Sequence, residues 1–211
     1  MTDEKLKIWN TMFIQKTRNM RRITYKTEWS AIDYLDDYVK QIPTPRSHAP
    51  DYMYFNVYNL PEKKKNALGD MFKIRDGLII ISERMYALLQ QFDTGATLFF
   101  EIPLFEYNQT DRRPGTYYIL HIAEQKQALV PEESEEIKLR GTNAQQGDIW
   151  YNDYNTGKIA VSAKSAAAGA DLWMDTNFRE RIFVSDRLKV AIKEAGIKAS
   201  ALTFLPCKVI A

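Results

Sequence analysis

The chain of 211 residues carries 29 basic and 27 acidic side chains, for a formal net charge of +2, and 45% of its residues are apolar. Length and composition are typical of a soluble globular protein of one domain, or of two small halves packed together. The balanced charge argues against a nucleic-acid binder, which needs a basic face, and the longest apolar run is too short for a membrane helix of about 20 residues.

Residues 1–50 are predicted to form an N-terminal helical extension ahead of an α+β domain at residues 51–211. The segment from residue 3 to about residue 40 is helix-prone, being rich in Lys, Leu, Met, Asp and Glu. Its clearest helix is "EWSAIDYLDDYVKQI", residues 28–42, where apolar residues recur at helical spacing: Trp29, Ile32, Leu35 and Val39. Three prolines between residues 43 and 50 end the segment.

The middle of the chain alternates between strand-like and turn-like composition. "YMYFNVYNL" at residues 52–60 is strand-like, and "LFEYNQTDRRPGTYYILHIAE" at 104–124 contains two strands around a polar turn. Residues 141–171 again mix strand and turn residues, with a hairpin end at 155–157. We therefore predict an α+β fold with a mixed, mainly antiparallel sheet.

One pattern occurs twice, in "LIIISERMYALLQQFDTGATLFFEIP" at residues 78–103 and in "RIFVSDRLKVAIKEAGIKASALTFLP" at residues 181–206. Each copy has an apolar strand, a Ser-acid-Arg triplet, an amphipathic stretch, a glycine and a second apolar strand. The triplets align at a constant offset, and one extra residue in the second copy then aligns Phe100 with Phe204. The repeat predicts two similar strand-helix-strand units.

The shared triplet has a structural and a functional interpretation. Ser82 and Ser185 directly follow an apolar strand, as helix N-caps do, and the acid after each serine falls in the first helical turn. Alternatively, Arg84 and Arg187, each near a helix N-terminus, hold an anion in a small ligand-binding or enzymatic domain. The structural interpretation, in which all four residues belong to helix caps, is favoured.

No assembled catalytic, cofactor or metal site is predicted. His48, His121 and Cys207 are too scattered for a metal motif, and no nucleophile motif or phosphate-binding glycine loop is present. Acidic clusters such as Glu132–Glu136 are typical of solvated surfaces, and the acids at 28–37 offset the basic N-terminal segment that would serve a nucleic-acid adaptor. The lone cysteine and the charged N-terminus favour a cytoplasmic protein.

The segment "DIWYNDYNTG" is a candidate partner-binding element. Its aromatic residues cannot all point inward on one short strand, because successive side chains face opposite sides. An aromatic side chain left exposed beside carboxylates suits a basic protein partner. The candidate contact residues are Trp150, Tyr151, Asp153 and Tyr154. Packing of these aromatics in the core is the favoured alternative.

Several segments in order resemble a family of bacterial polymorphic-toxin immunity proteins, family eleven, earlier catalogued as a domain of unknown function. "LWMDTNFRERIFVSDRLKVAIKEAGIKASALTFLP" at 172–206 is similar to the C-terminal signature of that family. "GLIIISERMYALLQQ" and "GTYYILHIAEQKQALVPEESE" resemble its middle, so the likeness covers residues 70–206. The chain departs from the pattern at Gln125–Ala128 and at Val130-Pro131.

The resemblance implies a cytoplasmic, non-enzymatic protein that binds and blocks a cognate bacterial toxin. It carries over no catalytic residue and no cofactor, because none is established for the family, and it does not identify the toxin. From this resemblance we expect a binding protein that acts on its partner by direct contact.

Overall fold

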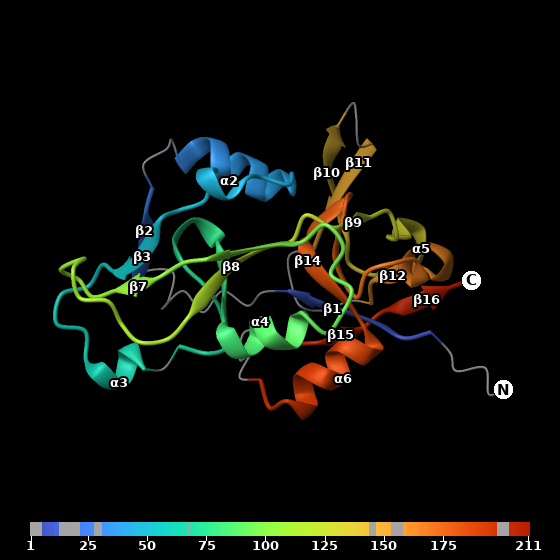
Figure 1. Ribbon diagram of the computed structural model, residues 1–211. Coiled ribbons are helices and arrows are strands. Elements are labelled where there is room, and N and C mark those ends of the chain that lie inside the picture. Colours follow the sequence, from blue (N-terminus) through green and yellow to red (C-terminus); the bar gives the residue numbers. More distant parts are fainter. Residues whose placement is uncertain are drawn as a thin grey trace.

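The computed structural model describes residues 6–12, 22–27, 31–66, 68–143, 147–152, 158–197 and 203–211. These residues form mainly antiparallel sheets with short helices packed on them, which confirms the predicted α+β class (Figure 1). The helices are α2 (Ala31–Lys40), α3 (Glu62–Lys65), α4 (Glu83–Leu89), α5 (Ala163–Ala167) and α6 (Asp186–Glu194).

Where the structure describes residues 3–40, the predicted helical segment is confirmed only at α2 and is wrong at two strands. Residues Ile8–Met12 form strand β1 and residues Ile23–Lys26 form strand β2, and among the described residues up to residue 40 only those of α2 are helical. Long-range pairing overrides the local helix preference, because β1 is bonded on both sides by strands from the other end of the chain. The division of the chain at residue 50 remains a prediction.

Helix α2 lies where a helix was expected, and the face that it buries matches the predicted one at Leu35 but not at Val39. Tyr34, Leu35 and Tyr38 pack on the core, whereas Val39 is 61% exposed. Trp29 lies outside the described residues, so its part in the expected face stays a prediction. The aromatic rings give α2 more apolar area to bury than Val39 does, and they set the orientation of the helix.

Two units of the same design form the centre of the molecule, as the repeat predicted. In unit one, helix α4 follows the hairpin of β4 (Met71–Lys73) and β5 (Ile79–Ser82). In unit two, helix α6 follows the hairpin of β13 (Leu172–Asp175) and β14 (Phe178–Ser185). The exit strands are β6 (Leu98–Glu101) and β15 (Leu205–Pro206).

The strand orders of the two units match. Unit one has the order β4-β5-β8-β6, where β8 is Tyr117–His121. Unit two has the order β15-β1-β14-β13, with β9 (Gln125–Lys126) added beside β13. β1 therefore takes the place in unit two that β8 takes in unit one, between the hairpin and the exit strand.

The register of the exit strands corrects the sequence alignment of the repeat. Phe100 lies opposite Ile119 in unit one, and Leu205 lies opposite Asn10 at the equivalent place in unit two. Phe100 is thus equivalent to Leu205 and not to Phe204. The connection from helix to exit strand in unit two is one residue longer than the alignment assumed.

A shared core joins the two units, and its members come from equivalent positions. The inward faces of both hairpins and of α4 and α6 meet there, and α4 and α6 lie near each other in Figure 1. From unit one come Met71, Ile81, Met85 and Leu89, and from unit two come Leu172, Val184, Leu188 and Ile192. Each amphipathic helix therefore buries its apolar face against its own hairpin and against the other unit.

The opposite faces of the two sheets are also covered. Ile80 faces a second core beneath α2, which includes the sheet of β2, β3 (Tyr52–Phe55) and β7 (Leu104–Phe105). Phe183 faces a third core, beside which β12 (Ala160–Ser162) pairs with β16 (Lys208–Ile210). Both faces are buried, and this explains why the central strands are continuously apolar.

His121, at the end of β8, is enclosed by aromatic rings. Its ring centroid lies 5.0 Å from that of Tyr38 and 5.9 Å from that of Tyr34. Within the described part of the chain, neither ring nitrogen has a hydrogen-bond partner. Burial lowers the pKa of His121 from its usual 6.5 to about 4, with the charge of Asp37 acting in the opposite direction.

The lowered pKa of His121 predicts a loss of stability in acid. Between pH 6.5 and about 4 the unfolded chain binds a proton that the folded chain does not, so the free energy of unfolding rises with pH. The contribution of the neutral His121 to stability is complete above pH 6.5. Below pH 6.5 the free energy of unfolding falls by up to about 1.4 kcal/mol per pH unit. Urea unfolding of wild type and His121→Phe at pH 7, 6 and 5 measures it. Parallel pH profiles would contradict the prediction.

The position of β1 predicts that removing it disrupts unit two. Deletion of residues 1–12 leaves β14 and β15 without the strand between them, and the thermal unfolding midpoint should fall sharply or cooperative unfolding should be lost. Deletion of residues 1–5 is the control, because it leaves β1 in place. Circular dichroism melts compare the variants, and equal midpoints would refute the role given to β1.

Candidate partner-binding surface

The serines of the repeat begin the helices that follow them. Ser82 is the N-cap of α4, and its Oγ accepts a hydrogen bond from the Met85 amide at 3.2 Å. Ser185 is the N-cap of α6 and accepts one from the Leu188 amide at 3.2 Å. Each hydroxyl satisfies an amide that the first helical turn leaves without an intrahelical partner.

Each serine also donates to an aspartate that binds the arginine of the same unit. In unit one, Ser82 donates to Asp70 at 2.8 Å, and Arg84 lies 3.8 Å from the same carboxylate. In unit two, Ser185 donates to Asp171 at 2.6 Å, and Arg187 donates to both carboxylate oxygens at 2.5 and 2.6 Å. We call each set an Asp-Ser-Arg cluster.

The sequence analysis did not single out the aspartate of either cluster, although the two aspartates occupy matching positions in the sequence. Asp70 and Asp171 each directly precede the first strand of their hairpin, in "GDMF" and "ADLW". The backbone carbonyl of each aspartate also accepts from the amide of its serine, at 2.9 and 3.0 Å. Each aspartate thus closes its hairpin by backbone and side chain together.

The two clusters also connect the units. Arg84 donates to the carbonyl of Ala195, at the end of α6. Asp171 of unit two accepts a hydrogen bond at 3.1 Å from the backbone amide of Asp93, which follows α4 in unit one. Burial alone would raise the pKa of Asp171, but hydrogen bonds from Arg187 and Ser185 hold it below its usual value.

This arrangement leaves little for an anion to bind. Arg84 and Arg187 are each engaged by a carboxylate of their own unit. Arg187 lines an open hollow of about 590 Å³ whose other charged residues are Lys7, Asp171, Asp186 and Glu194. The hollow is thus lined by three carboxylates and two cations, a balance that does not favour binding of an anion. The geometry therefore supports the interpretation of the Ser-acid-Arg triplets as structural.

The candidate metal ligands and nucleophiles considered in the sequence analysis do not come together as a reactive centre among the described residues. Among residues 6–12, 22–27, 31–66, 68–143, 147–152, 158–197 and 203–211, no three His, Cys, Asp or Glu side chains are grouped to hold a metal ion. Cys207 accepts a hydrogen bond from Asn10 at 3.4 Å, and burial raises the pKa of its thiol to about 12. This cysteine is therefore a packed thiol and not an activated nucleophile.

Trp150 lines an apolar groove between α2 and a projecting hairpin. The hairpin consists of β10 (Lys138–Asn143) and β11 (Gly147–Tyr151) and projects above the sheets in Figure 1. The groove has a volume of about 470 Å³ and is mostly apolar. Its lining residues are Tyr38, Val39, Gln41, Lys73, Asp76, Gly77, Ile79, Ile122, Arg140, Ile149, Trp150 and Met174.

Hydrogen bonds fix the walls of the groove. The Trp150 amide donates to the Asn177 carbonyl at 2.8 Å, and Asn177 donates to the Asp148 carbonyl at 2.6 Å. Asn152, just after β11, accepts from the buried Arg181 at 3.2 Å. On the other wall, the Gln41 amide donates to the Met174 sulfur at 3.3 Å. The groove is therefore preformed.

The structure combines the two interpretations of Trp150. Its half-buried side chain packs on the third core and also lines the groove. Tyr151 is half-buried, with the Lys138 ammonium 6.0 Å from its ring centroid. Asp153 and Tyr154 lie outside the described residues. Three large apolar side chains near the groove or on its hairpin are exposed: Val39, Ile42 and Leu139.

Comparison with known protein families identifies the chain. Residues 11–209 match the model of the Immunity protein family (Imm11). The chain belongs to the Imm11 family. The match covers nearly the whole sequence and confirms the resemblance noted in the repeat and in the middle of the chain. A search of curated proteins finds no match.

Membership of Imm11 supports a toxin-neutralising role in general, with a toxin as the partner. In the part of the chain that the structure describes, no helix is both long and apolar enough to span a membrane.

The Asp-Ser-Arg clusters predict unequal costs for equivalent substitutions. Asp171→Asn should lower the free energy of unfolding by about 2 kcal/mol, because the carboxylate accepts two charge-assisted bonds from Arg187 and one from Ser185. Asp70→Asn is the matched control in unit one and should cost about 1 kcal/mol, because Arg84 contacts Asp70 only at 3.8 Å. Urea unfolding measures both, and equal costs would contradict the assignment.

Proposed function

We propose that this Imm11 protein neutralises a cognate bacterial toxin in the cytoplasm by direct, non-catalytic binding. The observation that carries the proposal is the family match over residues 11–209. Binding blocks a toxin either by covering its active site or by holding an inactive conformation. Neither route requires the immunity protein to carry out chemistry.

The groove beside Trp150 is the proposed contact surface. Its walls are held by hydrogen bonds before any partner arrives, so little conformational entropy is lost on binding. Trp150 offers a large, rigid contact area, and Val39 and Leu139 add exposed apolar surface nearby. Tryptophan in a preformed pocket is the kind of residue that dominates interface energies. Tyr151, Asp153 and Tyr154 remain proposed members of the same contact.

The alternative function, a small ligand-binding or enzymatic domain, requires Arg84 and Arg187 to be available to an anion. Both guanidinium groups bind the aspartates that close the hairpins. Releasing Arg84 would also remove its contact with the Ala195 carbonyl of the other unit. The geometry therefore favours the binding protein.

The direct test uses the toxin encoded beside the gene for this protein. Both proteins are produced together, and co-purification and the survival of cells expressing the toxin are measured. The proposal expects a stable complex and protection. If the folded wild-type protein neither bound the toxin nor protected cells, the proposed function would be wrong.

Substitution in the groove should weaken the complex. Trp150→Ala is expected to raise the Kd at least about tenfold, since buried aromatic anchors carry much of the binding energy of an interface. Because Trp150 also packs on the core, Val39→Glu tests the groove through an exposed side chain. Val190→Ala, at an exposed site on α6, is the control. Unchanged affinity in both groove variants would exclude this surface.

A further inference from the structure

A second exposed surface lies on two loops away from the groove lining. The loop after β3 carries Val57 and Tyr58, and the loop after β7 carries Tyr107. Tyr58 is 71% exposed and Tyr107 is 48% exposed, and their rings meet edge to face with centroids 5.5 Å apart. We call these three residues, with Lys63 and Lys64 of α3, the tyrosine-lysine face.

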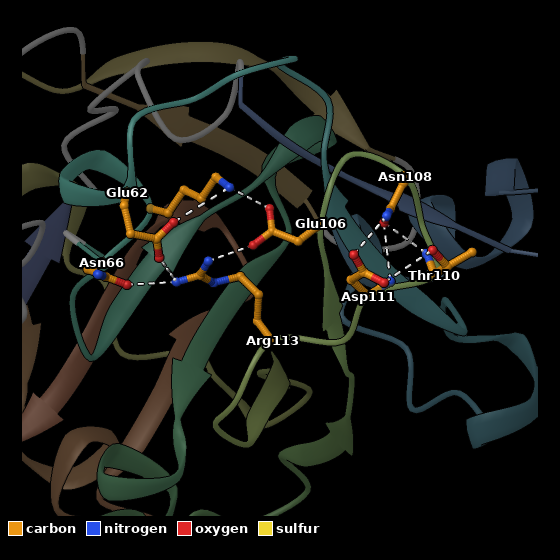
Figure 2. Close-up of polar contacts among 8 residues, drawn as sticks. Glu62, Asn66, Glu106, Asn108, Thr110, Asp111 and Arg113 are labelled. Carbon is orange, nitrogen blue, oxygen red and sulfur yellow. Dashed lines mark hydrogen bonds and ion pairs between the residues drawn. The ribbon is translucent and has the colours of Figure 1, made fainter.

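An ion-pair network joins the β7–β8 loop to α3, the helix that follows the loop after β3, as Figure 2 shows. Arg113 donates to Glu106 at 2.6 Å and to Glu62 at 2.7 Å, and so joins the β7–β8 loop to α3. It also donates to Asn66 at 2.7 Å, and Lys65 donates to Glu106 at 2.6 Å. The network lowers the pKa of Glu62, chiefly through the hydrogen bond from Arg113.

The tip of the β7–β8 loop is also held by its own hydrogen bonds (Figure 2). The side-chain oxygen of Asn108 accepts from the amides of Thr110 and Asp111, both at 3.1 Å. The Asn108 amide group donates to the Asp111 carboxylate at 2.9 Å, and the Glu106 amide donates to the Asp111 carbonyl at 2.9 Å. Tyr107 therefore sits on an ordered loop, and its exposure is part of the fold.

The charge on this face is not balanced. Within the network, the two cations Lys65 and Arg113 are matched by Glu62 and Glu106. Lys63 and Lys64 are exposed on α3, and neither forms an ion pair with another residue that the structure describes. Asp111 supplies one negative charge, which its hydrogen bonds direct into the loop. The outward charge is therefore positive.

We infer that the tyrosine-lysine face binds an acidic patch on the surface of the toxin, an inference that rests on the proposed function. Rigid tyrosines supply contact area at a low cost in conformational entropy, as they do in antibody combining sites. The two unpaired lysines complement carboxylates and speed association with an acidic partner. The groove beside Trp150 alone is small for a stable interface, which usually buries about 800 Å² on each partner. A second contact region supplies the remaining area.

The experiment compares two double variants with a matched control. Tyr58→Ala with Tyr107→Ala removes the aromatic contact, and Lys63→Glu with Lys64→Glu reverses the charge. Lys164→Glu is the control, because Lys164 is likewise exposed at the second position of a short helix. Binding kinetics with the purified toxin are measured at low and moderate salt, and thermal melts establish that each variant is folded.

The inference expects three results. The tyrosine variant should raise the Kd at least about tenfold, mainly through faster dissociation. The lysine variant should lower the association rate and weaken its dependence on salt, because rim charges act mainly on association. The control should bind within about twofold of wild type.

The outcomes separate this inference from the proposed function. If wild type neither binds nor protects, the proposed function fails, and the inference fails with it. If wild type binds and the folded tyrosine variant binds equally well, only the inference is overturned. If the lysine variant binds the toxin as well as wild type does, or better, the inference that the face binds an acidic patch is wrong. Binding of a DNA or RNA oligonucleotide that is lost only in the lysine variant assigns the face to nucleic acid instead.

Discussion

Strand β1 is held between β14 and β15, and the architecture of the second half of the molecule depends on this pairing. Ile8 faces the third core and Trp9 faces the core shared by the units, so the strand contributes to both sides of its sheet. The Trp9 indole N–H donates to Asp186 at 2.7 Å, and the Lys189 ammonium lies 4.1 Å from the centroid of the Trp9 ring. Both contacts tie β1 to α6. In unit one the equivalent strand, β8, comes from within the unit. Unit two is complete only with a strand from the opposite end of the chain.

The matching strand orders and the Asp-Ser-Arg clusters describe a duplicated unit whose copies have become mutually dependent. Each unit supplies one half of the shared core, and each contacts the end of the helix in the other. The contact surfaces proposed for the partner lie outside this central pair. The groove uses α2 and the β10–β11 hairpin, and the tyrosine-lysine face uses the loops around α3. The duplicated centre is thus a scaffold, and the parts that are not repeated carry the proposed recognition.

The sequence predicted the repeated helices well because their signals are local. A serine after an apolar strand, with an acid in the next turn, was enough to place the starts of α4 and α6. β1 was mistaken for helix because its structure depends on pairing with residues 169 to 177 positions away. The groove was also beyond sequence analysis, because its lining comes from separate stretches of the chain: residues 38, 39 and 41, residues 73, 76, 77 and 79, and residues 122, 140, 149, 150 and 174. Trp150 was found by its chemistry, and its neighbours could be found only from the fold.

The placement of β1 also has a consequence for the order of events on the ribosome. Asn10 bonds to Leu205, 195 positions later, so the strand must wait for almost all of the chain before its sheet can close. At about 5–20 residues per second this wait lasts roughly ten to forty seconds. Unit one has all of its strands by residue 121 and can fold much earlier. Protection by a newly made molecule would therefore begin only after its C-terminal strand has emerged, however early the first half becomes ordered.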